Sequence, residues 1–85
     1  MTKCIRIVGV RSHNRAENGP EMQKVFTRHG HIIMNRSGIP SPDRETGIIS
    51  LICEAEENEV KDLVGDLQGV EGVIADFMTL ECIPE

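Results

Sequence analysis

The stretch from Gly30 to Cys53, GHIIMNRSGIPSPDRETGIISLIC, decides the fold of this chain. It begins and ends with apolar runs rich in β-branched residues, and such runs are typical of strands. We expect these strands over 31–37 and 48–54. Residues 38–47 lie between them and hold glycine, serine, aspartate and two prolines, a composition that indicates a loop. The stretch therefore predicts a strand, a long hairpin loop and a second strand.

The helix before this stretch has two possible starts. Asn18 is a good N-cap, because Pro20 then falls in the first turn and Glu21 completes a capping box. An earlier start with Asn14 as the cap would make Pro20 a kink. In both cases we expect the helix to end at Gly30. Its apolar stripe recurs at helical spacing and consists of Met22, Val25, Phe26 and His29.

The remaining elements extend the pattern in both directions along the chain. Residues 4–10 (CIRIVGV) predict a first strand, followed by a polar loop over 11–15. A second helix ends at Gly69, and we interpret Gly65 inside it as a close approach of helix to sheet. A last strand covers 73–80. The apolar stripe of the second helix consists of Val60, Leu63, Val64 and Leu67.

The element order βαββαβ predicts an α+β, ferredoxin-like sandwich: a four-stranded antiparallel sheet with two helices on one face. Eighty-five residues fit one domain over 1–85. The helix-free face of such a sheet should be polar, but two strands are apolar on both sides. On the last strand, one side of the sheet would carry Val73, Ala75 and Phe77, and the other side would carry Ile74, Met78 and Leu80. On the strand before the second helix, one side would carry Ile48 and Ile52, and the other would carry Ile49, Leu51 and Cys53. We expect a homodimer or homotetramer that covers the helix-free face, the alternative being an irregular pattern in a small domain.

Composition narrows the classes of partner. The net charge is −5 and the only aromatic residues are Phe26 and Phe77, so neither the basic footprint nor the stacking platforms of a nucleic-acid-binding protein are present. The same charge is unfavourable at an anionic membrane surface, and no apolar run reaches the roughly 20 residues of a membrane helix. Three cysteines and no visible targeting segment predict reduced thiols and a cytoplasmic location.

Metal binding and catalysis have weak support. A metal site needs three or four converging ligands, usually with a spacing such as CxxC or HxxxH, and His13, His29 and His31 show no such spacing. We therefore expect no metal and no cofactor, with a metal-responsive sensor using these histidines or Cys53 as a rival. Cysteines on strands behave as small hydrophobic residues. We assign no catalytic residue and expect a protein that is not an enzyme.

A small acylphosphatase-like hydrolase is the rival from another class, because it shares the element order. It would use Arg11 in a phosphate-binding loop with Asn14 nearby. The loop lacks the run of glycines that lets several backbone N–H groups converge on a phosphate. The hydrolase therefore stays the weaker alternative.

The best candidate for a small-ligand site is the loop after the first strand. Its side chains are cationic or hydrogen-bonding, and it leads into a helix N-terminus, which favours anions. We expect Arg36 and Gly38, the latter in the segment Gly38–Pro40, at the edge of an adjacent subunit. The alternative is that these are solvated loop residues. The candidate loop residues are Arg11, Ser12, His13, Asn14 and Arg15.

Five segments carry a family resemblance: IVGV at 7–10, RHGHII at 28–33, RSGIP at 36–40, GIISL at 47–51 and LQGVEGV at 67–73. With this order of elements the chain resembles the ACT-like domains, and more closely the small stand-alone ACT-like family of iron-only hydrogenase system regulators. It is also similar to the C-terminal domain of the nickel-responsive transcriptional regulator. The chain departs from that domain because His29 and His31 lie at a turn, and because no ribbon-helix-helix segment precedes the fold.

The resemblance implies a regulatory module that is not an enzyme. Such modules pair or stack their sheets and often bind amino acids or other small effectors where subunits meet. We therefore expect a transcriptional or hydrogenase-system regulator that binds a small effector at a subunit interface and makes no direct contact with nucleic acid. The effector would change the packing between subunits through its different affinity for two arrangements.

Overall fold

The computed structural model describes residues 3–40 and 46–82, apart from the side chains of Arg15, Ala16 and Pro40. The tip of the expected hairpin loop and the last three residues of the expected tail lie outside the described residues. The elements follow the order β1 (Cys4–Ser12), α1 (Arg15–Arg28), β2 (Ile33–Pro40), β3 (Gly47–Ala55), α2 (Glu57–Gln68) and β4 (Val73–Cys82). The predicted βαββαβ order is confirmed.

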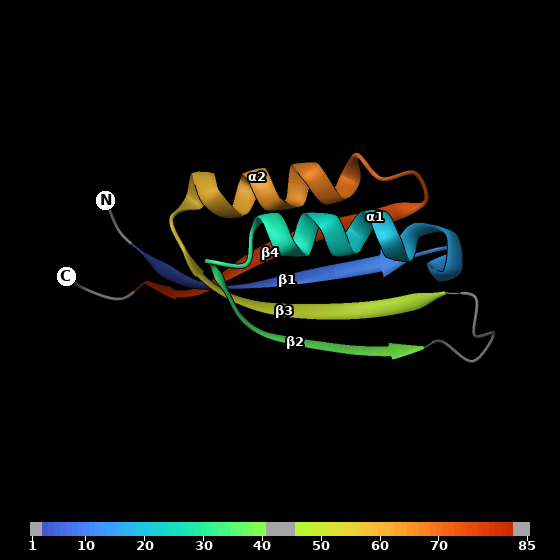
Figure 1. Ribbon diagram of the computed structural model, residues 1–85. Helices are drawn as coiled ribbons and strands as arrows, with labels where there is room; N and C mark the ends of the chain where they lie inside the picture. Colours follow the sequence, from blue (N-terminus) through green and yellow to red (C-terminus); the bar gives the residue numbers. More distant parts are fainter. Residues whose placement is uncertain (1–2, 41–45, 83–85) are drawn as a thin grey trace.

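The four strands form one sheet in the order β2-β3-β1-β4, and all three neighbouring pairs are antiparallel. Both helices lie on the same face of this sheet, and the start of β1 and the end of β4 lie at the same end of it (Figure 1). This is the ferredoxin-like fold. The strands are longer than expected, so Arg11 and Ser12 belong to β1 and Gly38 belongs to β2.

Helix α1 begins with Asn14 as its cap, so the preferred start at Asn18 is wrong and the alternative holds. The side-chain carbonyl of Asn14 accepts a hydrogen bond from the backbone N–H of Glu17 at 3.3 Å. Pro20 consequently lies inside the helix. Asn18 cannot act as the cap because its side chain is buried and bonds to Ser12 instead. The helix ends at Arg28, with His29 as its C-cap.

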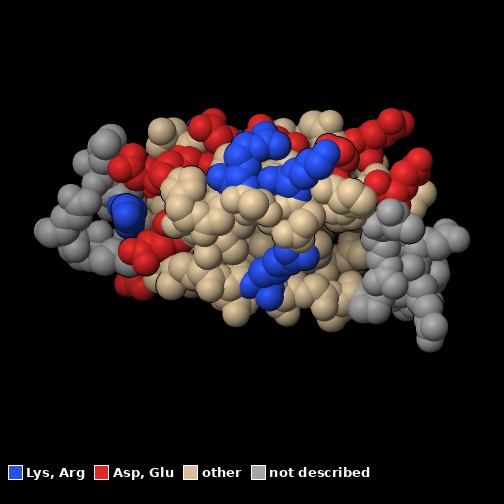
Figure 2. Space-filling view, viewed as in Figure 1, with Lys and Arg blue, Asp and Glu red and all other residues tan. Residues whose placement is uncertain are grey.

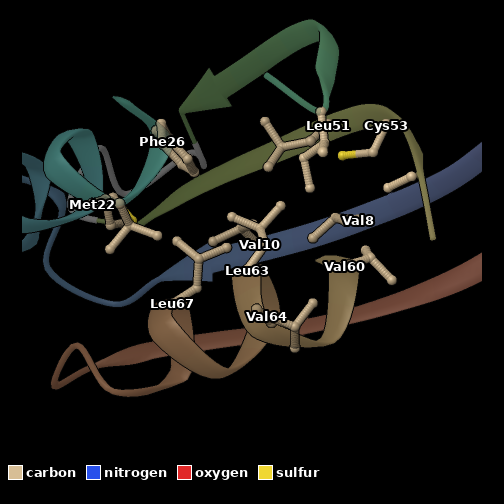
Figure 3. Packing of buried hydrophobic residues seen from close by; sticks show 14 of the residues in the cluster. Val8, Val10, Met22, Phe26, Leu51, Cys53, Val60, Leu63, Val64 and Leu67 are labelled. Atoms are coloured by element: carbon tan, nitrogen blue, oxygen red, sulfur yellow. The ribbon is translucent and has the colours of Figure 1, made fainter. Parts of the chain in front are cut away.

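The hydrophobic core lies between the helices and the sheet. Figure 3 shows Leu67 of α2 directed toward Val10 of β1, and Val60, Leu63 and Val64 belong to the same buried cluster. Burying each such side chain contributes about 1.5–3 kcal/mol. The interpretation of Gly65 as a close approach is wrong, since a Cβ atom there would meet no atom within 4 Å. Gly65 is exposed on the outer face of α2.

Two strands carry a bulge. Along β1 and β4 the paired residues are regular from Ser12↔Val73 to Arg6↔Thr79, and the register then shifts, so that Ile5 pairs with Glu81. Leu80 is the extra residue. A similar shift in β2 leaves Met34 as the extra residue opposite β3. A bulge of this kind adds one residue to one strand and changes which residues face each other beyond it.

The expectation of three reduced thiols is wrong. Cys4 and Cys82 form a disulfide, with their Cα atoms 3.9 Å apart, and Cys53 is a free, buried thiol. The bulge explains the pairing, because it places Cys82 directly opposite Cys4. The disulfide removes one ground for the expected cytoplasmic location.

None of the helices in the described part of the chain is long and apolar enough to cross a membrane.

Candidate functional site

The two loops at one end of the sheet are joined by hydrogen bonds. The backbone N–H of His13, between β1 and α1, donates to the carbonyl oxygen of Gly72, between α2 and β4, at 2.9 Å. Beneath this contact the side-chain amide of Asn18 donates to Ser12 Oγ at 3.2 Å, and both side chains are buried. The first hydrogen bond ties the loop after β1 to the loop before β4, and the second ties the start of α1 to the end of β1.

Gly72 is required at this junction for two reasons. Its φ is +82°, a conformation that residues with a Cβ atom rarely adopt. A Cβ atom at this position would also lie 2.9 Å from Nδ2 of Asn18. The close approach of the two loops therefore depends on a glycine.

A prediction follows for this glycine. Gly72→Ala is expected to lower the free energy of unfolding by about 1–3 kcal/mol, because the backbone is strained and the Asn18–Ser12 bond is disturbed. Gly65→Ala is the matched control and is expected to raise it by about 1 kcal/mol, since it removes a helical glycine in open space. Urea unfolding of both variants measures the difference. Equal stability of the two variants would contradict this role of Gly72.

A cleft of about 390 Å³ opens beside this junction, between the first half of α1 and the loop before β4. Its lining residues are Asn14, Glu17, Asn18, Glu21, Val70, Glu71 and Gly72. Three of these described residues are carboxylates and none of them is cationic, so this part of the cleft favours a ligand with a positive charge or N–H donors. This differs from the anion that we expected at this helix N-terminus.

The candidate loop residues are divided between two sides of the sheet. Asn14 lines the cleft, Ser12 lies buried beneath it and His13 is exposed at the junction. Arg11 is exposed on the helix-free face, because it alternates with the buried Val10 and Ser12. The side chain of Arg15 lies outside the described residues.

Arg36 and Gly38 lie away from the cleft on β2, an edge strand. The guanidinium of Arg36 lies over the ring of Phe26, 4.7 Å from its centroid, and donates to Oε1 of Gln23 at 2.9 Å. Gly38 lines a separate hollow of about 150 Å³, whose other walls include Ile39, Ile48 and Ile49. The seven candidate residues therefore do not form one site.

The helix-free face has a regular pattern that follows from the strand register. One row across the sheet contains Ile39, Ile48, Arg11 and Ile74, and another contains Asn35, Ile52, Ile7 and Met78. Between them runs a row of small or polar residues, Ser37, Ser50, Gly9 and Asp76. The exposed large apolar residues on this face include Ile39 (63% exposed) and Ile74 (58%). The prediction that β3 and β4 are apolar on both sides is confirmed.

Charge is distributed unevenly around this face. In the side view of Figure 2 acidic side chains lie over the helix layer and toward the ends of the molecule, whereas the lower, sheet half is mostly uncharged apart from one basic patch. Arg11 and Asp76 stand in adjacent rows of the helix-free face, and Arg11 forms no ion pair among the described residues. An apolar face with an unpaired cation and a nearby carboxylate is suited to contact with another protein surface.

Comparison with known proteins shows the family to which the chain belongs. The model of the TM1266-like family, described as "Iron-only hydrogenase system regulator, putative", matches residues 4–76. The chain belongs to this family. No curated protein matches the chain.

Solved structures share the fold. TM1266 from Thermotoga maritima, an uncharacterized protein, is 20% identical and superposes with a TM-score of 0.86 over 93% of this chain and 99% of its own. A nitrogen regulatory PII-like protein, CPII from Thiomonas intermedia K12, bound to ADP, AMP and bicarbonate, is 10% identical, with a TM-score of 0.58 over 100% of this chain and 98% of its own. An unknown protein from Galdieria sulphuraria is 5% identical, with a TM-score of 0.65 over 96% of this chain and 48% of its own. These likenesses concern the fold alone.

The rival functions gain no support from the geometry. His29 Nε2 lies 2.7 Å from Asp66 Oδ2 and His31 lies beside Glu59, and no three potential ligands gather anywhere in residues 3–40 and 46–82. Burial raises the pKa of the Cys53 thiol to about 11, which disfavours the thiolate that a metal requires. Arg11 and Asn14, the pair that a phosphate-binding loop would use, lie on different sides of the sheet.

Proposed function

We propose that this TM1266-like chain is a non-enzymatic, homo-oligomeric regulatory domain that senses a small effector. Its helix-free face is the contact between subunits, and its cleft beside α1 binds the effector. The observation that carries the proposal is the pair of largely apolar rows on the helix-free face, which together extend over all four strands. Family membership supports the regulatory role.

A second copy of the chain is the occupant that the helix-free face favours. In a symmetric face-to-face pair each surface meets itself, so a residue and its counterpart exchange roles across the axis. The free Arg11 of one subunit would then meet the partner subunit's Asp76, and the reverse pair would form as well. The apolar rows on both sides of these charges would be covered at the same time.

The cleft and the proposed subunit contact are joined by short segments. Arg11 is followed within three residues by Asn14, which lines the cleft, and Ile74 follows two residues after Gly72. A ligand that changes the distance between α1 and the loop before β4 would therefore move β1 and β4, which carry Arg11 and Ile74 on the helix-free face. An effector acts in this way only if it binds one arrangement of the subunits more tightly than another.

The charge pair provides the test of the subunit contact. Arg11→Asp and Asp76→Arg are each expected to weaken self-association by about tenfold or more, because like charges then oppose across the contact. The double variant Arg11→Asp/Asp76→Arg restores opposite charges and is expected to recover the oligomer. Sedimentation analysis over a range of concentrations measures all three. Failure of the double variant to recover association would count against the face-to-face pair.

The effector is tested with cationic compounds, since carboxylates line the cleft. Free amino acids and small amines are screened for a rise in the melting temperature, and a ligand at 100 times its Kd adds about 2.7 kcal/mol of stability. Glu71→Gln removes one lining charge and is expected to reduce the response, whereas Glu57→Gln, on the exposed side of α2, should leave it unchanged. No response to any compound would leave a domain that only assembles.

A further inference from the structure

The three cysteines lie together at one end of the sheet, on its helix-facing side. Cys4 is paired with Cys82 on β4 and with Ala55 on β3, and Cys53 is paired with Arg6. The disulfide joins residues 78 positions apart, at the beginning of β1 and the end of β4. It therefore fastens the first strand of the fold to the last.

The bulge at Leu80 makes this bond possible. If the regular register from Ser12↔Val73 to Arg6↔Thr79 continued, Cys4 would face Glu81. The extra residue shifts the pairing by one, so that Cys82 faces Cys4 and its side chain lies on the same side of the sheet. Bulges redirect side chains in this manner, and here the redirected side chain is a cysteine.

The two cysteine residues of the disulfide differ in exposure. Cys4 is only 2% exposed, whereas Cys82 is an exposed residue on an edge strand. The residues from Met78 to Cys82 are all exposed, and within the described residues two pairs connect β4 to β1 beyond the bulge. This difference in residue exposure favours attack by a solution thiol at Cys82 over attack at Cys4.

A buried cation lies two residues from Cys4 on the same face of β1. Arg6, two residues after Cys4 on the same face, is 4% exposed, and its Nε donates to the carbonyl oxygen of Ala55 at 3.1 Å. Its Nη1 donates to Oγ1 of Thr79 on β4. Because Ala55 is the residue opposite Cys4, the guanidinium lies at the level of the disulfide. A positive charge in this place stabilises a thiolate leaving from Cys4.

Burial keeps Cys53 from taking part in thiol–disulfide exchange with Cys4 and Cys82. It has no exposed surface, and it is the one free cysteine of the chain. A thiol that stays protonated does not attack a disulfide, because the thiolate is the nucleophile. The bond is therefore protected from exchange with the neighbouring thiol and open only to thiols from outside.

We propose that the Cys4–Cys82 disulfide is a thiol-exchange site that a small dithiol opens by attack on the sulfur of Cys82. In the first step the reductant's thiolate forms a bond to Cys82 Sγ, the Cys82–Cys4 bond breaks, and Cys4 leaves as a thiolate that takes up a proton. In the second step the reductant's other thiolate attacks the mixed disulfide, Cys82 leaves as a thiolate, and the reductant ends as a cyclic disulfide. Two electrons pass to the protein, which releases the end of β4 from β1.

The experiment uses the folded wild-type protein with dithiothreitol and iodoacetamide, followed by mass spectrometry. Without reductant, unfolded protein is expected to take up one label, on Cys53. With reductant, folded protein is expected to take up label on Cys82 at least about tenfold faster than on Cys53, because local opening precedes global unfolding. A brief treatment with 2-mercaptoethanol should place the mixed disulfide on Cys82.

Cys53→Ala is the control variant, and its rate of reduction should equal that of the wild type. Three labels on unreduced, unfolded protein would overturn the proposal, because no disulfide would then exist. Labelling of Cys82 and Cys53 at the same rate would also overturn it, because reduction would then need global unfolding. The proposal does not depend on the subunit contact or the effector.

Discussion

The double variant Ile48→Lys/Ile74→Lys is expected to be a folded monomer of about the 9.4 kDa chain mass, and the wild type is expected to be a dimer or a larger oligomer. Both isoleucines lie on the helix-free face in the same row across the sheet, on either side of Arg11. Two added lysines per subunit would place like charges opposite one another in a face-to-face pair. Buried, unpaired charges of this kind cost several kcal/mol, enough to dissociate a small interface.

The fold should survive these substitutions, because Ile48 and Ile74 are already 45% and 58% exposed in the isolated chain. Asn58→Lys is the control: it adds a lysine on the exposed side of α2, away from the sheet, and should leave the oligomer intact. Circular dichroism establishes that each variant is folded before light scattering gives its mass. A double variant that keeps the wild-type mass would exclude this face as the contact.

Hydrophobic pattern and element order were sufficient to predict the fold. The stripe from Val60 to Leu67 repeats at helical spacing and is buried as expected, and Ile74, Met78 and Leu80 are exposed as the alternation on the last strand requires. Both signals are local, so they can be read without knowing which strands are neighbours. The apolar helix-free face was predictable for the same reason.

The choice between Asn14 and Asn18 as the helix cap was not predictable in this way. Both residues are suitable caps, and the local sequence favours Asn18 because of Pro20 and Glu21. The decision rests on a tertiary contact, since burial of Asn18 against Ser12 uses its side chain in the core. Tertiary packing overrides local preference here.

The site was only partly predictable, because its two halves come from distant parts of the sequence. Asn14 was expected to bind a ligand, but Glu71 and Gly72 join it only through the return of the chain after α2. The only local sign of this junction was Gly72, a glycine between Glu71 and the first β-branched residue of the last strand. Without the strand register, nothing connected it with the loop after β1.

The disulfide is the clearest case of information that local pattern does not carry. Alternation alone predicts a regular register along β4, in which Cys4 would face Glu81 rather than Cys82. The bulge at Leu80 shifts the register by one residue, so that Cys4 faces Cys82. The odd number of cysteines therefore led to the wrong expectation of three reduced thiols, because the number of cysteines says nothing about which of them lie side by side in the fold.

Loss of this disulfide is expected to have a large effect on stability. Cys82→Ser should lower the free energy of unfolding by about 4 kcal/mol, because the bond joins residues 78 positions apart, closes nearly the whole chain and so restricts the unfolded state strongly. Serine at this exposed position leaves no cavity, so the effect belongs to the bond and not to packing. Urea unfolding with and without reductant measures it.

The reductant provides the internal control for this prediction. Wild-type protein in dithiothreitol should lose about as much stability as Cys82→Ser, and the variant itself should not respond to dithiothreitol. The loss should appear first in β4, where hydrogen exchange of residues 79–82 is expected to increase more than that of α2, because the strand end is exposed and only two pairs hold it beyond the bulge. Equal stability of oxidised and reduced wild type would show that the core alone holds β4 to β1.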